Sequence, residues 1–160
     1  MGAGGEWAAV GVRRCHPREL PMDLLLLADP SPQMVASYLE GWGFAAEGFD
    51  EIVGAAIAQP INSRVLELMN IAVAPHWQSQ GVGRQLILAV EAAATEAGIL
   101  SISVGTGNSS LDQWAFYQKC GFRLVGIDHD YFLRNYAIPI FENGIQCRDM
   151  IRLSLDVSSR

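Results

Sequence analysis

The chain has 160 residues, half of them hydrophobic, and a net charge of −6 at pH 7. We expect one domain spanning residues 1–160, because a chain of this length can bury a sizeable core. The acidic charge argues against bulk nucleic-acid binding, and the sequence shows neither an apolar run long enough to span a membrane nor a signal-peptide pattern.

The pattern of apolar residues predicts a mixed α/β (α+β) domain. In chain order we expect a strand at 7–14, helices at 22–27 and 33–39, paired strands at 43–49 and 52–58, a strand at 65–73, a helix at 82–97, a strand at 100–104, a helix at 111–119 and closing strands at 124–127 and 150–157. The prolines at 30 and 32 break the first helix, and Gly98 ends the long one. The connection 128–148 is expected to be irregular.

The three cysteines, Cys15, Cys120 and Cys147, are odd in number and lack Cys-x-x-Cys spacing. The three histidines are too scattered in the sequence to suggest a shared ligand set. We therefore expect reduced thiols in a cytoplasmic protein, and no metal site.

The most informative segment joins the strand at 65–73 to the long helix. It reads Gln78-Ser79-Gln80-Gly81-Val82-Gly83-Arg84. A glycine-bearing turn at a helix N-terminus offers free backbone N–H groups at the positive end of the helix dipole, which suits a pyrophosphate. We expect the two glycines to let the backbone approach the anion, and Arg84 to add charge-assisted hydrogen bonds. The turn lacks the Gly-Lys-Ser/Thr of a Walker A loop and the third glycine of a dinucleotide fingerprint.

Together with two later segments, this turn resembles the GNAT superfamily of acetyl-CoA-dependent N-acetyltransferases. The Gln-x-x-Gly-x-Gly pattern is similar to the superfamily's motif A, and Gly105-Thr106-Gly107-Asn108-Ser109-Ser110 and Phe116-Tyr117-Gln118-Lys119-Cys120-Gly121-Phe122 follow in the family's order. The resemblance covers roughly residues 43–156. It implies a mixed, mostly antiparallel sheet that splays between its fourth and fifth strands, flanked by about four helices.

The resemblance also implies acetyl-CoA as a co-substrate, with its pyrophosphate on the amides of residues 78–84. Alternation along the strand at 65–73 would place Glu67, Met69, Ile71 and Val73 on one face. The backbone of this strand, including Ile71 and Val73, would contact the acetyl group and pantetheine. Asn108 would bind the pantetheine or a water; an asparagine in this segment also suits a simple turn.

Tyr117 is the candidate general acid, because the family places a tyrosine at this position near the thioester sulfur and a phenol can donate a proton to a thiolate. Alternatively, Phe116 and Tyr117 are a core aromatic pair whose hydroxyl is satisfied locally. Glu67 is the candidate base or water-relay residue, or else an ordinary solvated strand residue. Cys120 is more typical of an inert buried thiol than of an acetyl carrier.

The sequence thus predicts an N-acetyltransferase that moves an acetyl group to a primary amine by direct attack in a ternary complex. The alternative is a coenzyme A-binding module without useful catalysis. We expect the amine to be a small molecule selected by residues 128–148 through Asp130, Tyr136 and Glu142, because carboxylates beside aromatic rings suit a cation; a structural flap is the other interpretation. Part of this segment, 139–144, is similar to a tail in a bacterial subset of GNAT proteins of poorly defined substrate. A homodimer is implied by the family alone.

Overall fold

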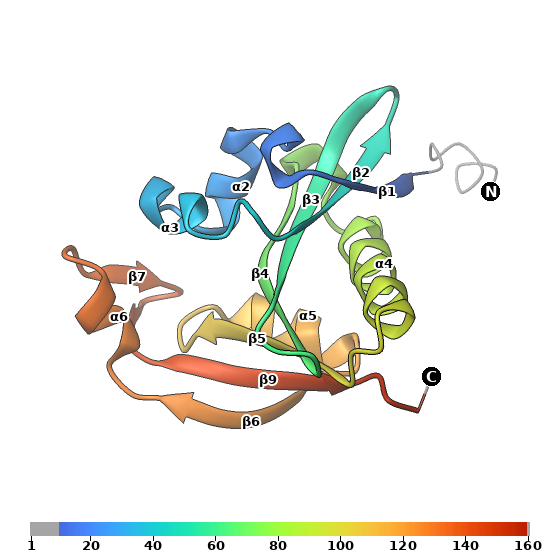
Figure 1. Ribbon diagram of the computed structural model, residues 1–160. Helices are drawn as coiled ribbons and strands as arrows, with labels where there is room; N and C mark the ends of the chain where they lie inside the picture. The colour runs from blue at the N-terminus through green and yellow to red at the C-terminus, as the bar shows by residue number, and fades with distance from the viewer. Residues whose placement is uncertain (1–9, 160) are drawn as a thin grey trace, which may run out of the picture.

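The computed structural model describes residues 10–159, and its centre is a seven-stranded sheet (Figure 1). The strand order is β1-β2-β3-β4-β5-β9-β6, and every neighbouring pair is antiparallel except β4–β5. The strands are β1 (Gly11–Cys15), β2 (Trp42–Gly48), β3 (Glu51–Pro60), β4 (Val65–Val73), β5 (Ser101–Gly107), β6 (Arg123–Asp128) and β9 (Met150–Asp156). The first residues of the strand predicted at 7–14 lie outside the described part of the chain.

Helices cover both faces of this sheet and produce two buried clusters (Figure 1). Helices α2 (Met22–Ala28) and α3 (Pro32–Ala36) pack on one face through residues such as Leu25 and Val35, which are fully buried. Helix α4 (Val82–Glu96) packs on the other face, where apolar residues at helical spacing, Leu86 and Val90 among them, enter the larger cluster. Helix α5 (Leu111–Lys119) contributes Tyr117 to the same cluster.

Strands β4 and β5 are paired with each other only along the first part of their length. Their parallel pairing runs from Val65–Ser101 to Leu68–Val104, whereas β4 continues to Val73 and β5 to Gly107. The predicted splay between the fourth and fifth strands is therefore confirmed. Beyond Leu68 and Val104 the two strands no longer pair with each other, so the sheet is open in its middle.

A β-bulge in β4 corrects the alternation predicted for that strand. Ile57 pairs with Asn70, but the next residue of β3, Ala58, pairs with Leu68, so Met69 is an extra residue. Side chains that should share a face are consequently divided: Met69 packs toward the cluster under α2 and α3, and Ile71 toward the cluster under α4. The prediction that Glu67, Met69, Ile71 and Val73 share one face was wrong, because an inserted residue reverses the parity of those that follow.

The connection 128–148 is not irregular as predicted. It contains helix α6 (Tyr131–Asn135) and a hairpin of strands β7 (Ile140–Glu142) and β8 (Ile145–Cys147). Asn143 and Gly144 form the two-residue hairpin loop with φ angles of 55° and 73°, as expected for an Asn-Gly turn between paired strands. The strands have only three residues each, too few for alternation to reveal them.

Candidate active site

Two adjoining cavities lie beside the opening between β4 and β5. The anion-loop cavity, about 650 Å³, is lined by Ile71, Val73, residues at 77–84 and one side of α5. The aromatic cavity, about 450 Å³, is lined by Glu67, Tyr117, residues of α6 and the β7–β8 hairpin, and the end of α2. Leu27, Ala28 and Gln113 line both cavities. The two spaces therefore meet at the end of α2 and the first turn of α5.

The turn before α4 presents unpaired backbone amides to the anion-loop cavity. The first helical hydrogen bond is donated by the Gln85 N–H to the Gly81 carbonyl at 3.1 Å, so the amides of Val82, Gly83 and Arg84 precede the helical ladder. The first turn carries no acidic side chain. The turn itself is fixed, because Gln78 Nε2 donates to the Val73 carbonyl at 3.0 Å and Gln80 Nε2 to the His76 carbonyl at 2.9 Å.

The two glycines of this turn serve different purposes. Gly81 has a φ of 85°, which favours glycine, and a Cβ there would meet nothing within 4 Å. At Gly83 a Cβ would lie 3.0 Å from Cζ of Phe116 on α5. Gly83 also lines the anion-loop cavity, and its lack of a side chain allows close packing of α4 against α5.

Arg84 and Cys120 lie together at the α5 side of the anion-loop cavity. The Arg84 guanidinium donates to the Lys119 carbonyl at 3.3 Å, which holds it beside the cavity. Burial raises the pKa of the Cys120 thiol, an effect that nearby Arg84 partly opposes. The thiol is therefore protonated at neutral pH, which makes it a poor nucleophile.

Tyr117 is buried, yet it lines the aromatic cavity. Its ring lies between Phe116 and Phe122, with centroid separations of 5.4 and 5.6 Å. Within residues 10–159 its hydroxyl makes no hydrogen bond, and burial raises the pKa of the phenol. The local partner supposed by the core-pair interpretation is thus missing from the described residues.

Glu67 lines the aromatic cavity on the side of the sheet opening. Its Oε1 lies 3.6 Å from Arg152 Nη1 on β9 and accepts a hydrogen bond from Ser103 Oγ at 3.4 Å. Its side chain is 23% exposed, so it is not the freely solvated strand residue of the alternative interpretation. Ile71 and Val73 line the anion-loop cavity instead, beyond the bulge.

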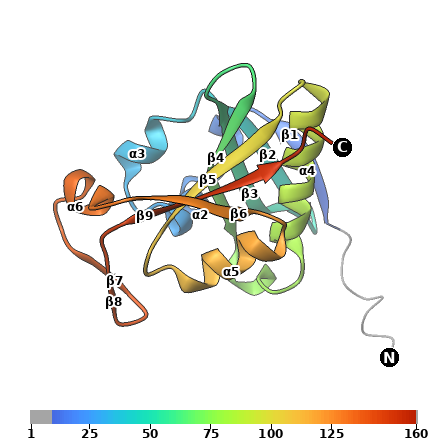
Figure 2. The same cartoon turned by 90° about the horizontal axis from the view of Figure 1, so that it is seen from below.

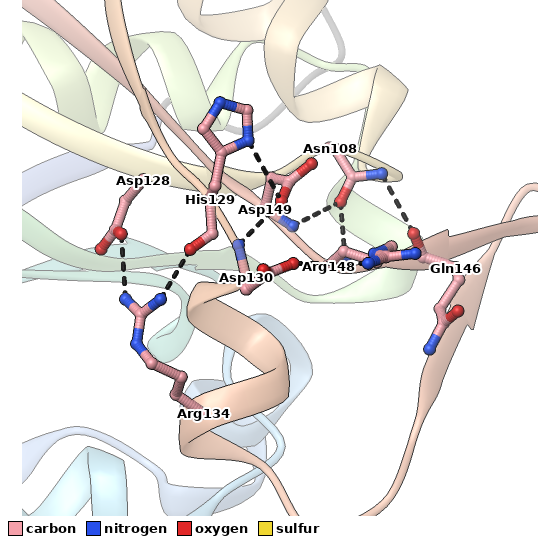
Figure 3. A network of polar contacts seen from close by, with 8 residues as sticks. All are labelled: Asn108, Asp128, His129, Asp130, Arg134, Gln146, Arg148 and Asp149. Atoms are coloured by element: carbon pink, nitrogen blue, oxygen red, sulfur yellow. Dashed lines mark hydrogen bonds and ion pairs between the residues drawn. The ribbon is translucent and has the colours of Figure 1, made fainter.

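Asn108 belongs to a polar network (Figure 3). Its Oδ1 accepts the backbone N–H groups of Arg148 and Asp149 at 2.7 and 2.9 Å, and its Nδ2 donates to the Gln146 carbonyl at 3.0 Å. These bonds join the end of β5 to the chain just after β8. Asn108 lines neither cavity, and its amide is occupied in holding the backbone.

Of the three residues expected to select the amine, two line the aromatic cavity and one does not. Tyr136 and Glu142 line the aromatic cavity, whereas Asp130 lies outside both cavities and faces Arg148 at 3.4 Å (Figure 3). Glu142 Oε1 accepts hydrogen bonds from Ser110 Oγ at 2.8 Å and Ser109 Oγ at 3.2 Å. Figure 2 shows the β7–β8 hairpin beside the loop that leads into α5.

Sequence reasoning missed a hydrogen-bonded group on the opposite wall. Asp29 Oδ2 accepts a hydrogen bond from the Tyr38 hydroxyl at 3.1 Å, and Asp29 Oδ1 accepts one from the Tyr136 hydroxyl at 3.5 Å. Asn70 Nδ2 donates to the Tyr38 hydroxyl at 3.0 Å. An aspartate before a proline gives no signal in the sequence for a partner 107 residues away.

Two general features of residues 10–159 bear on the site. No group of three or more His, Cys, Asp or Glu side chains in this part of the chain is arranged to hold a metal ion. None of its helices combines the length and the apolar character needed to cross a bilayer.

Comparison with known proteins gives consistent matches. Residues 13–122 match the model of the acetyltransferase (GNAT) family. The chain is 51% identical to the uncharacterized N-acetyltransferase YvbK of Bacillus subtilis (strain 168) over 136 residues, which cover 84% of this chain and 88% of the relative.

Two solved structures are similar over almost their whole length. An IAA acetyltransferase from Bacillus cereus is 43% identical with a TM-score of 0.88, covering 92% of this chain and 99% of that one. A GNAT family acetyltransferase from Elizabethkingia anophelis, solved with acetyl-CoA bound, is 40% identical with a TM-score of 0.87, covering 92% and 97%.

Proposed function

Because the chain belongs to the GNAT family of acetyltransferases, we propose that it transfers the acetyl group of acetyl-CoA to a primary amine of a small molecule. The amine attacks directly in a ternary complex, within a single domain spanning residues 1–160. The observation that carries this proposal is the meeting of two cavities at Leu27, Ala28 and Gln113. One cavity has the free amides that suit a pyrophosphate, and the other has carboxylates and aromatic rings.

The residues of the anion-loop cavity fit coenzyme A. The backbone amides of residues 78–84 and the Arg84 guanidinium would hold the pyrophosphate, and Ile71 and Val73 of β4 would line the path of the pantetheine. Acetyl-CoA supplies an activated acetyl thioester. Asn108 fits a supporting role, because its amide holds residues 146–149 in place rather than facing a cavity.

In the aromatic cavity, Tyr117 would act as general acid and Glu67 as base, directly or through water. A buried, protonated phenol without a hydrogen-bond acceptor is ready to donate its proton to a sulfur that gains negative charge. Glu67 lines this cavity beside Arg152, where its carboxylate would receive a proton from the amine. Tyr136 and Glu142 would contact the acceptor. Asp130 would act through Arg148 by stabilising the segment that carries them.

The test is thiol release from acetyl-CoA in the presence of a panel of primary amines, with the product identified by mass spectrometry. We expect amine-dependent release and an acetylated amine. Binding of acetyl-CoA without transfer to any amine would contradict the proposal and favour the coenzyme A-binding module. A cytoplasmic location remains a prediction that depends on the free cysteines at 15, 120 and 147.

We also propose that the protein forms a homodimer through β6, the edge strand of the sheet. Leu124, Val125 and Ile127 are 50%, 65% and 55% exposed. Two antiparallel β6 strands would place Arg123 of each copy near Asp128 of the other, as a twofold interface requires. Sedimentation equilibrium should show a dimer that Val125→Lys dissociates; a monomeric wild-type protein would contradict this proposal.

A further inference from the structure

The charged side chains that line the aromatic cavity do not balance. They are the carboxylates of Asp29, Glu67 and Glu142 and the guanidinium of Arg152. Arg152 lies 3.6 Å from Glu67 and compensates that carboxylate. Two negative charges therefore face the cavity without a matching positive charge on its wall.

The two remaining carboxylates are held by neutral donors only. Asp29 accepts hydrogen bonds from the hydroxyls of Tyr38 and Tyr136 and from the Ser31 N–H, and Glu142 from the hydroxyls of Ser109 and Ser110. Within residues 10–159 neither forms an ion pair, whereas nearby Asp128 and Asp130 each pair with an arginine. Neutral hydroxyls orient a carboxylate but do not compensate its negative charge, which can therefore pair with a cationic ligand.

Aromatic rings surround these carboxylates. Tyr38, Tyr131, Phe132 and Tyr136 all line the cavity. Phe132 and Tyr136 stack at a centroid separation of 5.5 Å, and Tyr131 lies edge-on to Phe132 at 5.1 Å. Ring faces beside carboxylates attract alkylammonium groups. An acceptor with a carboxylate of its own would instead add a third uncompensated negative charge.

We propose that the acceptor is an aliphatic diamine that enters as a dication, and that Asp29 is a specificity-determining residue that binds its non-reacting ammonium group. This inference rests on the acetyl transfer proposed above. The reacting ammonium loses one proton to Glu67 or water. Its nitrogen then bonds to the acetyl carbonyl carbon as the carbon–sulfur bond breaks, the nitrogen loses a second proton, and the thiolate gains one. The second ammonium keeps its charge throughout.

Three primary amines with the same four-methylene chain test the proposal: 1,4-diaminobutane, pentylamine and 5-aminopentanoate. They end in an ammonium, a methyl and a carboxylate group. We expect kcat/KM for the diamine to exceed that for pentylamine by about 10-fold or more, because the free energy of one charge-assisted hydrogen bond corresponds to about a 10-fold change. We expect 5-aminopentanoate to react most slowly. Equal rates for the diamine and pentylamine would overturn the inference, as would no transfer to the diamine alongside transfer to another amine.

The variant Asp29→Asn keeps the shape of the side chain and removes its charge. We expect it to raise KM for the diamine by about 10-fold and so to reduce the preference for the diamine over pentylamine, with the affinity for acetyl-CoA unchanged. The matched control is Asp23→Asn, which removes an exposed carboxylate from the first turn of α2, the helix whose C-cap is Asp29. It should change neither the KM for the diamine nor the preference for the diamine over pentylamine. Equal losses for both amines in Asp29→Asn would mean that Asp29 has a structural role only. No transfer to any amine by the wild-type protein would count against the proposed function itself.

Discussion

At the scale of single residues, the environment of Tyr117 favours a catalytic over a structural hydroxyl. The side chain is 5% exposed, and its hydroxyl has no hydrogen-bond partner within residues 10–159. Because Tyr117 lines the aromatic cavity, its hydroxyl is free to hydrogen-bond to a bound substrate or to water, which favours a role in the reaction.

We therefore expect Tyr117→Phe to lower kcat by about 100-fold, within the usual contribution of a general acid, while the melting temperature stays equal or rises. Steady-state kinetics and thermal unfolding of the same preparation measure both quantities. An unchanged kcat across pH 6–9 would end the assignment. A large fall in melting temperature would instead support a structural hydroxyl.

The four tyrosines determine how stability should depend on pH in the alkaline range. Burial raises the pKa of Tyr38, Tyr117, Tyr131 and Tyr136 above the ordinary value of 10.0, and nearby Asp29 adds to the effect at Tyr38, Tyr131 and Tyr136. Above pH 10 the unfolded chain therefore releases protons that the folded chain retains, so the free energy of unfolding falls as pH rises. The stabilisation is complete below pH 10 and is lost toward the higher pKa values of the folded state.

Thermal unfolding measured from pH 8 to pH 11 checks this sign. The melting temperature of the wild type should fall above pH 10, and the fall should be smaller in Tyr117→Phe, which lacks one of the four phenols. A melting temperature that rises with pH in this range would contradict it.

At the scale of elements, the turn before α4 makes a test of coenzyme A binding possible with two variants that differ only in charge. Gly81 precedes the helix with a φ of 85° and open space around its Cβ position. Asparagine and aspartate adopt this conformation more readily than other residues with a side chain. Gly83 is unsuitable, because a side chain there meets Phe116.

Gly81→Asp and Gly81→Asn form a matched pair that differs in one charge. We expect the aspartate to weaken acetyl-CoA binding by at least about 10-fold relative to the asparagine, because like charges placed together are strongly unfavourable. The aspartate should not destabilise the helix, since an anion at a helix N-terminus is favourable. Equal affinities by calorimetry would show that the pyrophosphate lies elsewhere.

At the scale of the whole molecule, the opening of the sheet brings the two cavities together. Cys120 lines the anion-loop cavity, but burial keeps its thiol protonated, so a covalent acetyl intermediate is not expected. Incubation with acetyl-CoA alone should leave the protein mass unchanged. An acetyl adduct on Cys120 that passes to added amine would contradict direct attack, and Cys120→Ser would then abolish transfer.

The sequence alone determined the elements with long-range periodicity and the turn before α4. Helix α4 was predicted at 82–97 and runs Val82–Glu96, and β4 was predicted with its observed ends. These succeed because the packing of a long element repeats the same pattern many times. The GNAT family followed from short motifs, since turns and helix ends require particular residues at fixed positions.

Only the tertiary structure decided which side chains meet in the aromatic cavity. The bulge at Met69 divides residues that simple alternation would place together. The short strands β7 and β8 carry Glu142 to the serines before α5, and Asp29 meets Tyr136 across most of the chain. A single inserted residue or a contact between distant segments leaves no periodic trace in the sequence, because its geometry depends on how whole elements pack.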